Sequence, residues 1–235
     1  MIVPVDLQIG DNVGIISTAR KISFEEVSPA VKILKKWGLK VIFGNHLFGE
    51  YNQFSGTIDQ RRADLQMMID DNNIKAILCA RGGYGTVQII DKINFDNLAK
   101  KPKWIIGYSD VTVLHSHLNT IGFASIHATM PINFSTNTSD ALLSLKHSLF
   151  GLENLYTISP HQNNRTGAVR GDIVGGNLSI LYSLLGSKSD IETEDKILLI
   201  EDLDEYLYHI DRMIMNLKRN NKLTNIKGLI IGKMK

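Results

Sequence analysis

The sequence AILCARGGYG at residues 76–85 and the sequence WIIGYSD at residues 104–110 decide the predicted fold. Each begins as an unbroken apolar run and ends in small or polar residues. A run without polar alternation is typical of a strand buried on both faces, as in a parallel sheet between two layers of helices. We expect a helix after each strand, the first running to about Ile93 and the second from Asp110 to about Asn119. The stretch therefore predicts an α/β fold.

The residues before this stretch continue the alternation of strand and helix. Residues 13–17 and 40–43 are apolar runs that we interpret as strands. Ser23 stands three residues before Glu26, and a second Thr-x-x-Gln pattern begins at Thr57. Both spacings are capping boxes, in which two side chains satisfy free amide groups at the start of a helix. The first half is thus predicted to be a parallel sheet with helices on both faces.

The sequence changes character after Pro131. Residues 159–166 are polar and contain Pro160, a composition typical of a linker between domains. We therefore predict an N-terminal domain at 1–158, a linker at 159–166 and a C-terminal domain at 167–235. Within the second domain, apolar patterns predict strands at 167–174, 196–200 and 228–232 and helices at 177–185 and 205–221.

Composition argues against several classes of protein. The net charge is +2, and no stripe of basic residues marks a nucleic-acid surface. No apolar run approaches the ~18 residues that a membrane helix needs, and the N-terminus lacks the pattern of a signal peptide. Cys79 is the single cysteine, which excludes an intrachain disulfide and a cysteine-based metal site. We expect a cytoplasmic protein that binds neither nucleic acid nor a membrane.

Ser109 lies where the strand at 104–108 gives way to a helix. At a tight strand-to-helix turn its hydroxyl would stand above the sheet, as in a nucleophile elbow. The amide of Asp110, in the first turn, would then be free to point at a developing oxyanion. The alternative interpretation is that Ser109 is only a helix N-cap, a position that serine prefers in any protein.

Two further segments are candidates for the same site. The glycines after Arg81 let the backbone approach a ligand closely at the carboxyl edge of the sheet, although a plain glycine turn is the alternative. Their spacing matches neither a P-loop nor a dinucleotide fingerprint. Glu201 is the first of four acids after an apolar strand, and a carboxylate held there can orient a histidine base. The alternative is that Asp202 or Asp204 caps the following helix and the other acids are solvated.

Four motifs occur in the order in which the LD-carboxypeptidase family carries them. They are Arg81-Gly82-Gly83-Tyr84-Gly85, Gly107-Tyr108-Ser109-Asp110-Val111-Thr112, Gly175-Gly176-Asn177-Leu178 and Ile200-Glu201-Asp202. From about Gly10 to its last residue the chain resembles this family of serine peptidases, which includes muramoyltetrapeptide carboxypeptidases of peptidoglycan recycling and immunity peptidases that degrade microcin C. The resemblance implies a flavodoxin-like N-terminal domain and a smaller, β-rich C-terminal domain, with the site between them.

The resemblance also implies roles for particular residues. Ser109 would be the nucleophile, and Glu201 would orient the catalytic histidine. The residues whose amides would form the oxyanion hole are Gly83, or Gly82 in its place, and Asp110. The side chains implied to contact the substrate are those of Arg81, Tyr84 and Asn177. The substrate would be a small peptide such as a murein tetrapeptide, and the resemblance implies no metal or cofactor.

Two departures from the family pattern affect the expected activity. Where many members carry His-Gly-Pro-Met, residues 127–130 are His-Ala-Thr-Met. The family's catalytic histidine follows the strand that begins at Gly228, whereas the single histidine after Glu201 is His209, which does not match the motif. His127 is the alternative base, and a structural histidine is the competing interpretation of it. We therefore expect a chain truncated before its catalytic histidine, with an incomplete C-terminal domain and little activity.

Three functions follow as hypotheses. The leading one is a serine carboxypeptidase that cleaves the L,D peptide bond before a terminal D-residue of murein peptides. A microcin-type immunity peptidase on the same scaffold differs from it in substrate. A protein that binds murein peptides without turnover is the non-catalytic alternative. A homodimer is the default expectation for a soluble enzyme.

Overall fold

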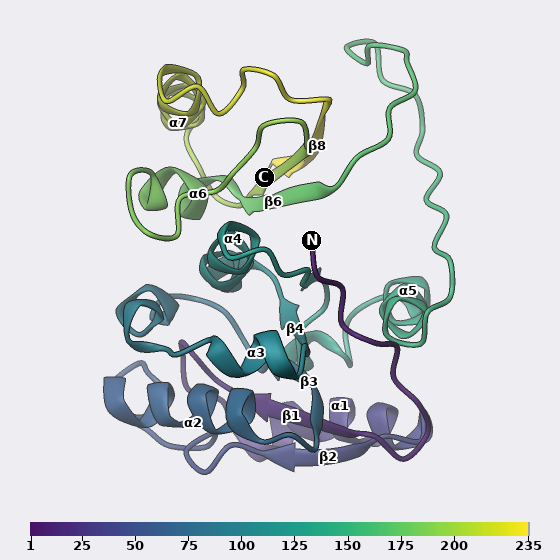
Figure 1. Ribbon diagram of the computed structural model, residues 1–235, viewed down its shortest axis with the longest axis vertical. Coiled ribbons are helices and arrows are strands. Elements are labelled where there is room, and N and C mark those ends of the chain that lie inside the picture. Colours follow the sequence, from purple (N-terminus) through teal and green to yellow (C-terminus); the bar gives the residue numbers. More distant parts are fainter. Residues whose placement is uncertain (235) are drawn as a thin grey trace.

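The computed structural model describes residues 1–234 and shows two α/β units, one above the other in Figure 1. The strands are β1 (Asn12–Ile16), β2 (Lys40–Phe43), β3 (Ile74–Cys79), β4 (Trp104–Gly107), β5 (Ile126–His127), β6 (Ile173–Asn177), β7 (Ile197–Asp202) and β8 (Gly228–Met234). The α-helices are α1 (Phe24–Lys36), α2 (Ile58–Asp70), α3 (Asp96–Lys100), α4 (Thr112–Thr120), α5 (Ser139–Leu149), α6 (Leu178–Leu184) and α7 (Leu207–Arg219).

The first unit is built on a parallel sheet in the order β2-β1-β3-β4-β5. Val13 of β1 pairs with Val41 of β2 on one side and with Ala76 of β3 on the other. This is the flavodoxin-like strand order, in which ligands bind outside the carboxyl ends of the strands. The predicted fold class is confirmed. Because β3 and β4 are neighbours, the segments after them begin at the same edge of the sheet.

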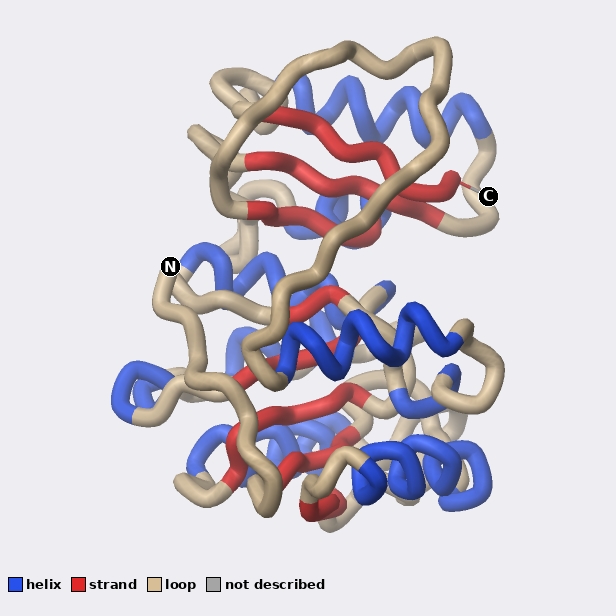
Figure 2. The backbone as a smooth tube through the Cα atoms, turned by 90° about the vertical axis from the view of Figure 1, so that its right-hand side faces the viewer, coloured by secondary structure: helices blue, strands red, loops and turns tan. Residues whose placement is uncertain are grey.

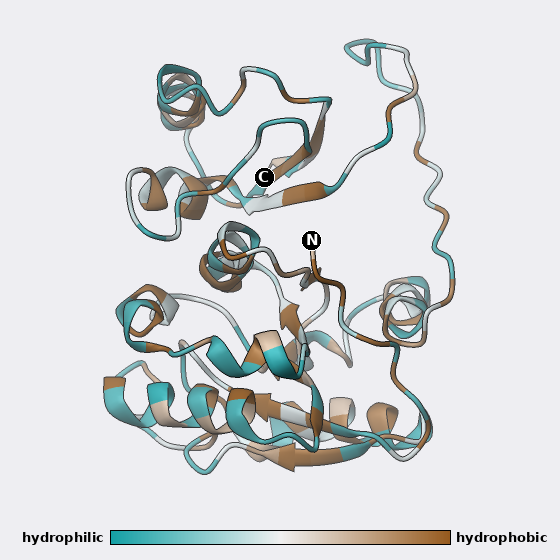
Figure 3. Ribbon diagram, in the orientation of Figure 1, coloured by the Kyte–Doolittle hydropathy of each residue, from teal (hydrophilic) through white to brown (hydrophobic). Residues whose placement is uncertain are grey.

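Helices cover both faces of this sheet, as unbroken apolar strands require. The core on one face packs side chains of α2, α3 and α4 against the sheet, and the core on the other face packs α1 and α5. Figure 3 shows the brown, hydrophobic strands lying between helices of mixed colour. The predicted capping boxes are present at Ser23 and Thr57; the Ser23 amide, for example, donates to Oε2 of Glu26 at 2.8 Å.

The second unit is a parallel sheet in the order β6-β7-β8, with α6 and α7 packed on it. Gly175 of β6 lies so close to β7 that a Cβ there would stand 1.8 Å from the carbonyl oxygen of Leu199. The glycines of β6 therefore permit strand pairing rather than interrupting it. Residues 151–172 contain no helix or strand and connect the units; Figure 2 shows this segment as a long tan tube.

Several elements differ from the predictions. The helix expected to end near Ile93 is replaced by two 3₁₀ turns, Thr86–Gln88 and Ile90–Lys92. This segment is rich in β-branched residues, which disfavour a helix, and the Thr86 hydroxyl donates to Asp110. The strand expected at 167–174 begins only at Ile173, since the residues before it are exposed and have no partner strand. The sequence patterns missed α3 and α5. None of the described helices combines the length and apolar composition that a membrane crossing needs.

Candidate active site

Ser109 occupies a left-handed backbone conformation, with φ of +61°, two residues after the end of β4. It opens a 3₁₀ turn that leads into α4, and its side chain makes no capping hydrogen bond there. The N-cap interpretation of Ser109 is therefore wrong for this structure. A left-handed conformation is strained for a residue with a Cβ atom and is typical of sharp strand-to-helix turns that expose a nucleophile. Within residues 1–234, no group forms a hydrogen bond with Ser109 Oγ.

The glycine-rich loop after β3 lies against this turn. A Cβ added to Gly82 would stand 3.2 Å from Cβ and 3.3 Å from Oγ of Ser109, and 3.5 Å from the amide nitrogen of Asp110. Gly83 has a φ of +117°, and a Cβ there would overlap the side chain of Arg20. The loop can therefore approach Ser109 this closely because it lacks side chains. Its backbone and the Asp110 amide border the same small volume beside the hydroxyl.

The carboxylate of Asp110 points away from solvent and holds the glycine-rich loop. Its Oδ2 accepts hydrogen bonds from the amide of Thr86 at 3.0 Å and from the Thr86 hydroxyl at 2.6 Å. Burial raises the pKa of Asp110, and the bonds from Thr86 oppose that rise. Asp110 thus contributes its side chain to the loop and its amide to the volume beside Ser109.

Glu201 lies near the end of β7, where it pairs with Asn177 of β6. Its Oε1 is buried and has no hydrogen-bond partner within residues 1–234. Burial raises the pKa of Glu201, and the charge of Asp202 raises it further. The pKa of Tyr108, the residue before Ser109, is raised by burial and then by the charge of Glu201.

Asp202, the acid next to Glu201, has a structural role. Its Oδ1 accepts from Nδ2 of Asn177 and from the Leu203 amide, both at 2.8 Å, and its Oδ2 accepts from the Ser179 amide at 2.8 Å. The alternative interpretation, that Asp202 or Asp204 caps the helix after it, is wrong, because α7 has Tyr206 at its N-cap without a side-chain bond. Asp202 stabilises the start of α6 instead.

The two units are joined directly behind Ser109. The amide of Asn177 donates to Oγ1 of Thr112, at the start of α4, at 3.0 Å. A Cβ on Gly176 would stand 2.6 Å from the same oxygen, so this contact also depends on a glycine. The elbow and the strand that carries Glu201 are therefore held together through β6. Thr112 is part of a quoted motif, but its type alone did not indicate this contact.

The side chains predicted to contact the substrate differ in their solvent exposure and in their hydrogen bonds. Tyr84 is half exposed, with its ring 6.2 Å from that of Phe54. Arg81 donates to the carbonyl oxygen of Lys21 at 3.2 Å and remains partly exposed. Asn177 is buried and caps α6 through its Oδ1. A substrate can therefore reach Tyr84 and Arg81 more easily than Asn177.

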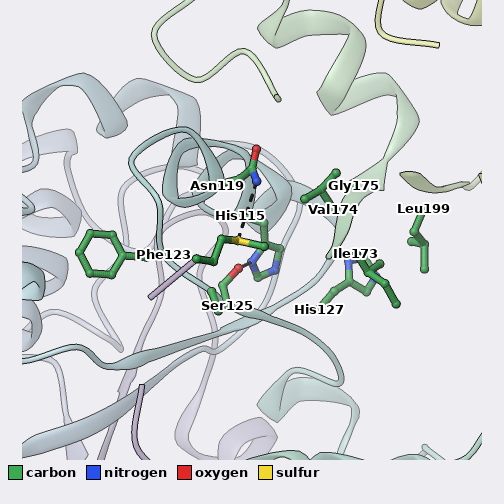
Figure 4. Close-up of a pocket in the computed structure, with 11 residues that line it drawn as sticks. His115, Asn119, Phe123, Ser125, His127, Ile173, Val174, Gly175 and Leu199 are labelled. Carbon is green, nitrogen blue, oxygen red and sulfur yellow. Dashed lines mark hydrogen bonds between the residues drawn. The ribbon is translucent and has the colours of Figure 1, made fainter. Parts of the chain in front are cut away.

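His127, the alternative base, lines a cavity of about 110 Å³ between the units (Figure 4). Its ring lies 6.2 Å from that of Tyr108 and 5.9 Å from that of His115, and burial lowers its pKa. Figure 4 shows His115 and Ser125 on the same side of the cavity and Val174 on the other. Ser109 is not among the lining residues. Strand pairing places His127 beside Gly107, two residues before Ser109, but no hydrogen bond joins His127 to Ser109 Oγ within residues 1–234.

His115 and His209 are each bound to other groups. Nε2 of His115 donates to the carbonyl oxygen of Gly107 at 2.9 Å, and its Nδ1 accepts from Oγ of Ser125 at 2.8 Å. His209, on α7, pairs with Glu205, which lies two residues before that helix begins. In the part of the chain that is described, no histidine forms a hydrogen bond with Ser109, and no cluster of side chains has the composition of a metal site.

Family models provide an independent comparison with this geometry. Residues 13–128 match the LD-carboxypeptidase N-terminal domain, and residues 170–235 match the LD-carboxypeptidase C-terminal domain. The chain belongs to the LD-carboxypeptidase family. The predicted resemblance is confirmed.

Individual LD-carboxypeptidase relatives agree with this assignment. The Bacillus subtilis (strain 168) protein named "Probable murein peptide carboxypeptidase" is 39% identical over 236 residues, which cover 97% of this chain and 73% of the relative. The crystal structure of an MccF-like protein from Bacillus anthracis (strain Ames) has a TM-score of 0.87 at 27% identity, covering 100% of this chain and 81% of the other. The wild-type apo structure of the microcin C7 self-immunity protein MccF has a TM-score of 0.86 at 22% identity and covers 100% and 81%, respectively, which shows a shared fold.

Proposed function

We propose that this chain carries the site of a serine carboxypeptidase that cleaves the L,D peptide bond before a terminal D-residue of murein peptides. The observation that carries the proposal is the strained Ser109, whose free hydroxyl faces the glycine-rich loop. The Bacillus subtilis relative, which is named for murein peptides, supports the substrate class.

The reaction follows from the residues around Ser109. Oγ forms a bond to the scissile carbonyl carbon, and the carbonyl π electrons move to its oxygen. The amides of Gly83, or Gly82, and of Asp110 donate to this oxyanion. The C–N bond then breaks, the amine of the D-residue takes a proton, and water hydrolyses the acyl-serine.

The proton of Ser109 Oγ needs a base, and we infer that Glu201 orients one. Its buried Oε1 can accept a hydrogen bond from an imidazole, which fixes the ring and stabilises its protonated form. Because no histidine within residues 1–234 forms a hydrogen bond with Ser109, we propose that these residues support only slow turnover. Loss of one triad member leaves only the rate that binding and the oxyanion hole supply.

Covalent labelling tests the nucleophile without requiring turnover. A fluorophosphonate should modify the wild-type chain at Ser109, detected by intact mass and peptide mapping. Ser109→Ala should remain unlabelled, whereas Ser183→Ala, on an exposed face of α6, should label like the wild type. Equal labelling of Ser109→Ala and the wild type would show that the nucleophile is another residue.

Release of D-alanine from a murein tetrapeptide tests the substrate class. We expect slow release that Ser109→Ala abolishes, and no release from the same peptide with an L-alanine terminus. The alternative substrate of an MccF-type immunity peptidase is tested by an aspartyl sulfamoyl adenosine, because one MccF structure holds that ligand. Faster cleavage of this compound than of the tetrapeptide would favour the immunity function.

A further inference from the structure

Arg61 is a buried cation that the proposed chemistry does not use. It lies on α2 and is 1% exposed. Its Nη1 donates to the carbonyl oxygens of Thr18 at 2.8 Å and Gly85 at 3.0 Å, and its Nη2 donates to Oε1 of Gln88 at 2.7 Å. The guanidinium carbon lies 4.6 Å from the centre of the Phe54 ring. Within residues 1–234 no carboxylate forms a salt bridge with it; burial lowers its pKa, and the negative charge of Asp110 opposes that change.

The two carbonyl groups that Arg61 binds belong to different segments. Thr18 follows β1, and Gly85 is the last glycine of the loop after β3. Gly85 has a φ of +148°, and a Cβ there would stand 2.5 Å from Nη1 of Arg61 and 3.0 Å from Cα of Ala19. The glycine therefore lets the guanidinium hold both backbones at once.

A second set of bonds connects the same two segments to the elbow. The Thr86 hydroxyl donates to Oδ2 of Asp110 at 2.6 Å. The Thr86 oxygen then accepts from the Thr18 hydroxyl, because the two Oγ1 atoms are 2.7 Å apart and the Thr86 proton is already used. The loop that supplies one amide of the oxyanion hole is thus bonded to Asp110, the residue that supplies the other.

We propose that Arg61 is a positioning residue for the oxyanion hole. This inference rests on the proposed function and extends it to a residue outside the four motifs quoted above. Arg61 fixes the glycine-rich loop relative to Ser109, so that the amides of the loop and of Asp110 converge on one oxygen. A displacement of about 1 Å at such a site costs about 100-fold in rate. Lysine cannot replace the planar fork, because its single nitrogen is not pre-organised for two carbonyl groups.

The geometry of the oxyanion hole can be tested by comparing the equilibrium binding of two matched ligands, which requires no catalytic base. The probe is the tripeptide L-Ala-γ-D-Glu-L-Lys with its terminal carboxyl group replaced by a boronic acid. A lone pair of Ser109 Oγ forms the O–B bond, the hydroxyl proton passes to water, and boron becomes a tetrahedral anion with no change in oxidation state. The same tripeptide with its normal carboxylate reports ground-state binding. Calorimetry gives both dissociation constants, and ¹¹B NMR identifies the tetrahedral adduct.

Arg61→Lys should weaken binding of the boronic acid at least about tenfold, or about 1.4 kcal/mol, while the carboxylate peptide changes less than about twofold. Thr86→Val, which removes the hydroxyl between Thr18 and Asp110, should also weaken binding of the boronic acid more than binding of the carboxylate peptide. It provides the test if Arg61→Lys does not fold. Arg62→Lys, the next residue on α2 with a partly exposed side chain, should change neither constant.

Two results would overturn the proposal. One is unchanged boronic acid binding in a folded Arg61→Lys or Thr86→Val variant. The other is an equal loss for both ligands, which would assign Arg61 a general structural role. Ser109→Ala separates this outcome from failure of the proposed function: a wild-type adduct that does not depend on Ser109 refutes the nucleophile, and the inference about Arg61 with it.

Discussion

Protonation of His115 should make this protein sensitive to mild acid. The imidazole is buried in α4 between Gly107 and Ser125, and burial, with a further contribution from the charge of His127, lowers its pKa to about 4. In the unfolded chain a histidine has a pKa of about 6.5. As the pH falls below about 6.5, His115 becomes protonated in the unfolded chain but stays neutral in the folded protein. The contribution of neutral His115 to the free energy of unfolding is therefore fully present above about pH 6.5 and is lost as the pH falls through 4.

The size of the effect follows from these two values. A difference of about 2.5 pKa units corresponds to a loss of about 2 kcal/mol of unfolding free energy at pH 5 and about 3 kcal/mol at pH 4. Other groups also titrate in this range, so the contribution of His115 is isolated by comparing it with a variant. His115→Gln keeps a side-chain amide that can donate to Gly107 and cannot titrate.

Urea unfolding at pH 7, 6, 5 and 4 provides the measurement. The wild type should lose about 2 kcal/mol more than His115→Gln between pH 7 and pH 5. His161→Gln, in the exposed segment between the units, should follow the wild type. Parallel losses in the wild type and His115→Gln over this range would refute the argument that a buried neutral imidazole supports Gly107.

Three further predictions concern individual positions. Gly175→Ala should destabilise the protein by more than about 3 kcal/mol, and Gly186→Ala by about 1 kcal/mol. Both glycines have positive φ, but only a Cβ at Gly175 would collide with Leu199. Thermal unfolding measures the difference, and equal losses in the two variants would contradict the close approach of β6 to β7. Ser109→Gly should be about 1 kcal/mol more stable than Ser109→Ala in urea, since glycine tolerates a φ of +61°; no difference would argue against strain. Added imidazole should raise D-alanine release by the wild type several-fold, as measured by chromatography. Glu201→Gln should reduce this increase, because Glu201 is proposed to orient the base. An equal increase in the wild type and in Glu201→Gln would show that Glu201 is not part of the site.

Local patterns in the sequence predicted those parts of the fold that local interactions determine. The apolar strands gave the fold class, and the capping boxes at Ser23 and Thr57 located the starts of α1 and α2. The glycine-rich loop and Ser109 were predicted to meet because they follow strands that the fold places side by side. The roles assigned to these residues remain predictions that the proposed experiments test.

Features that depend on tertiary contacts could not be predicted in this way. Arg61 precedes another arginine on a polar helix, a pattern typical of a solvent-facing residue, and only the carbonyl groups of Thr18 and Gly85 explain its burial. A cap on the following helix was the alternative role for Asp202, but Asp202 accepts from the Ser179 amide at the start of α6, which precedes it in the chain. In both cases the partner lies more than twenty residues away, where neither periodicity nor propensity gives information.

The division of the site between two units has a consequence for the order in which function arises during synthesis. The elbow, the glycine-rich loop and Arg61 all lie within the first unit, whereas Glu201 follows the long segment at 151–172. Domains generally fold from the N-terminus as the chain emerges from the ribosome. A nascent chain would therefore form the turn at Ser109 before Glu201, the acid proposed to act with it, has been made. The two parts of the proposed site would come together only when β6 docks on α4, so the bond between Asn177 and Thr112 would form late in folding.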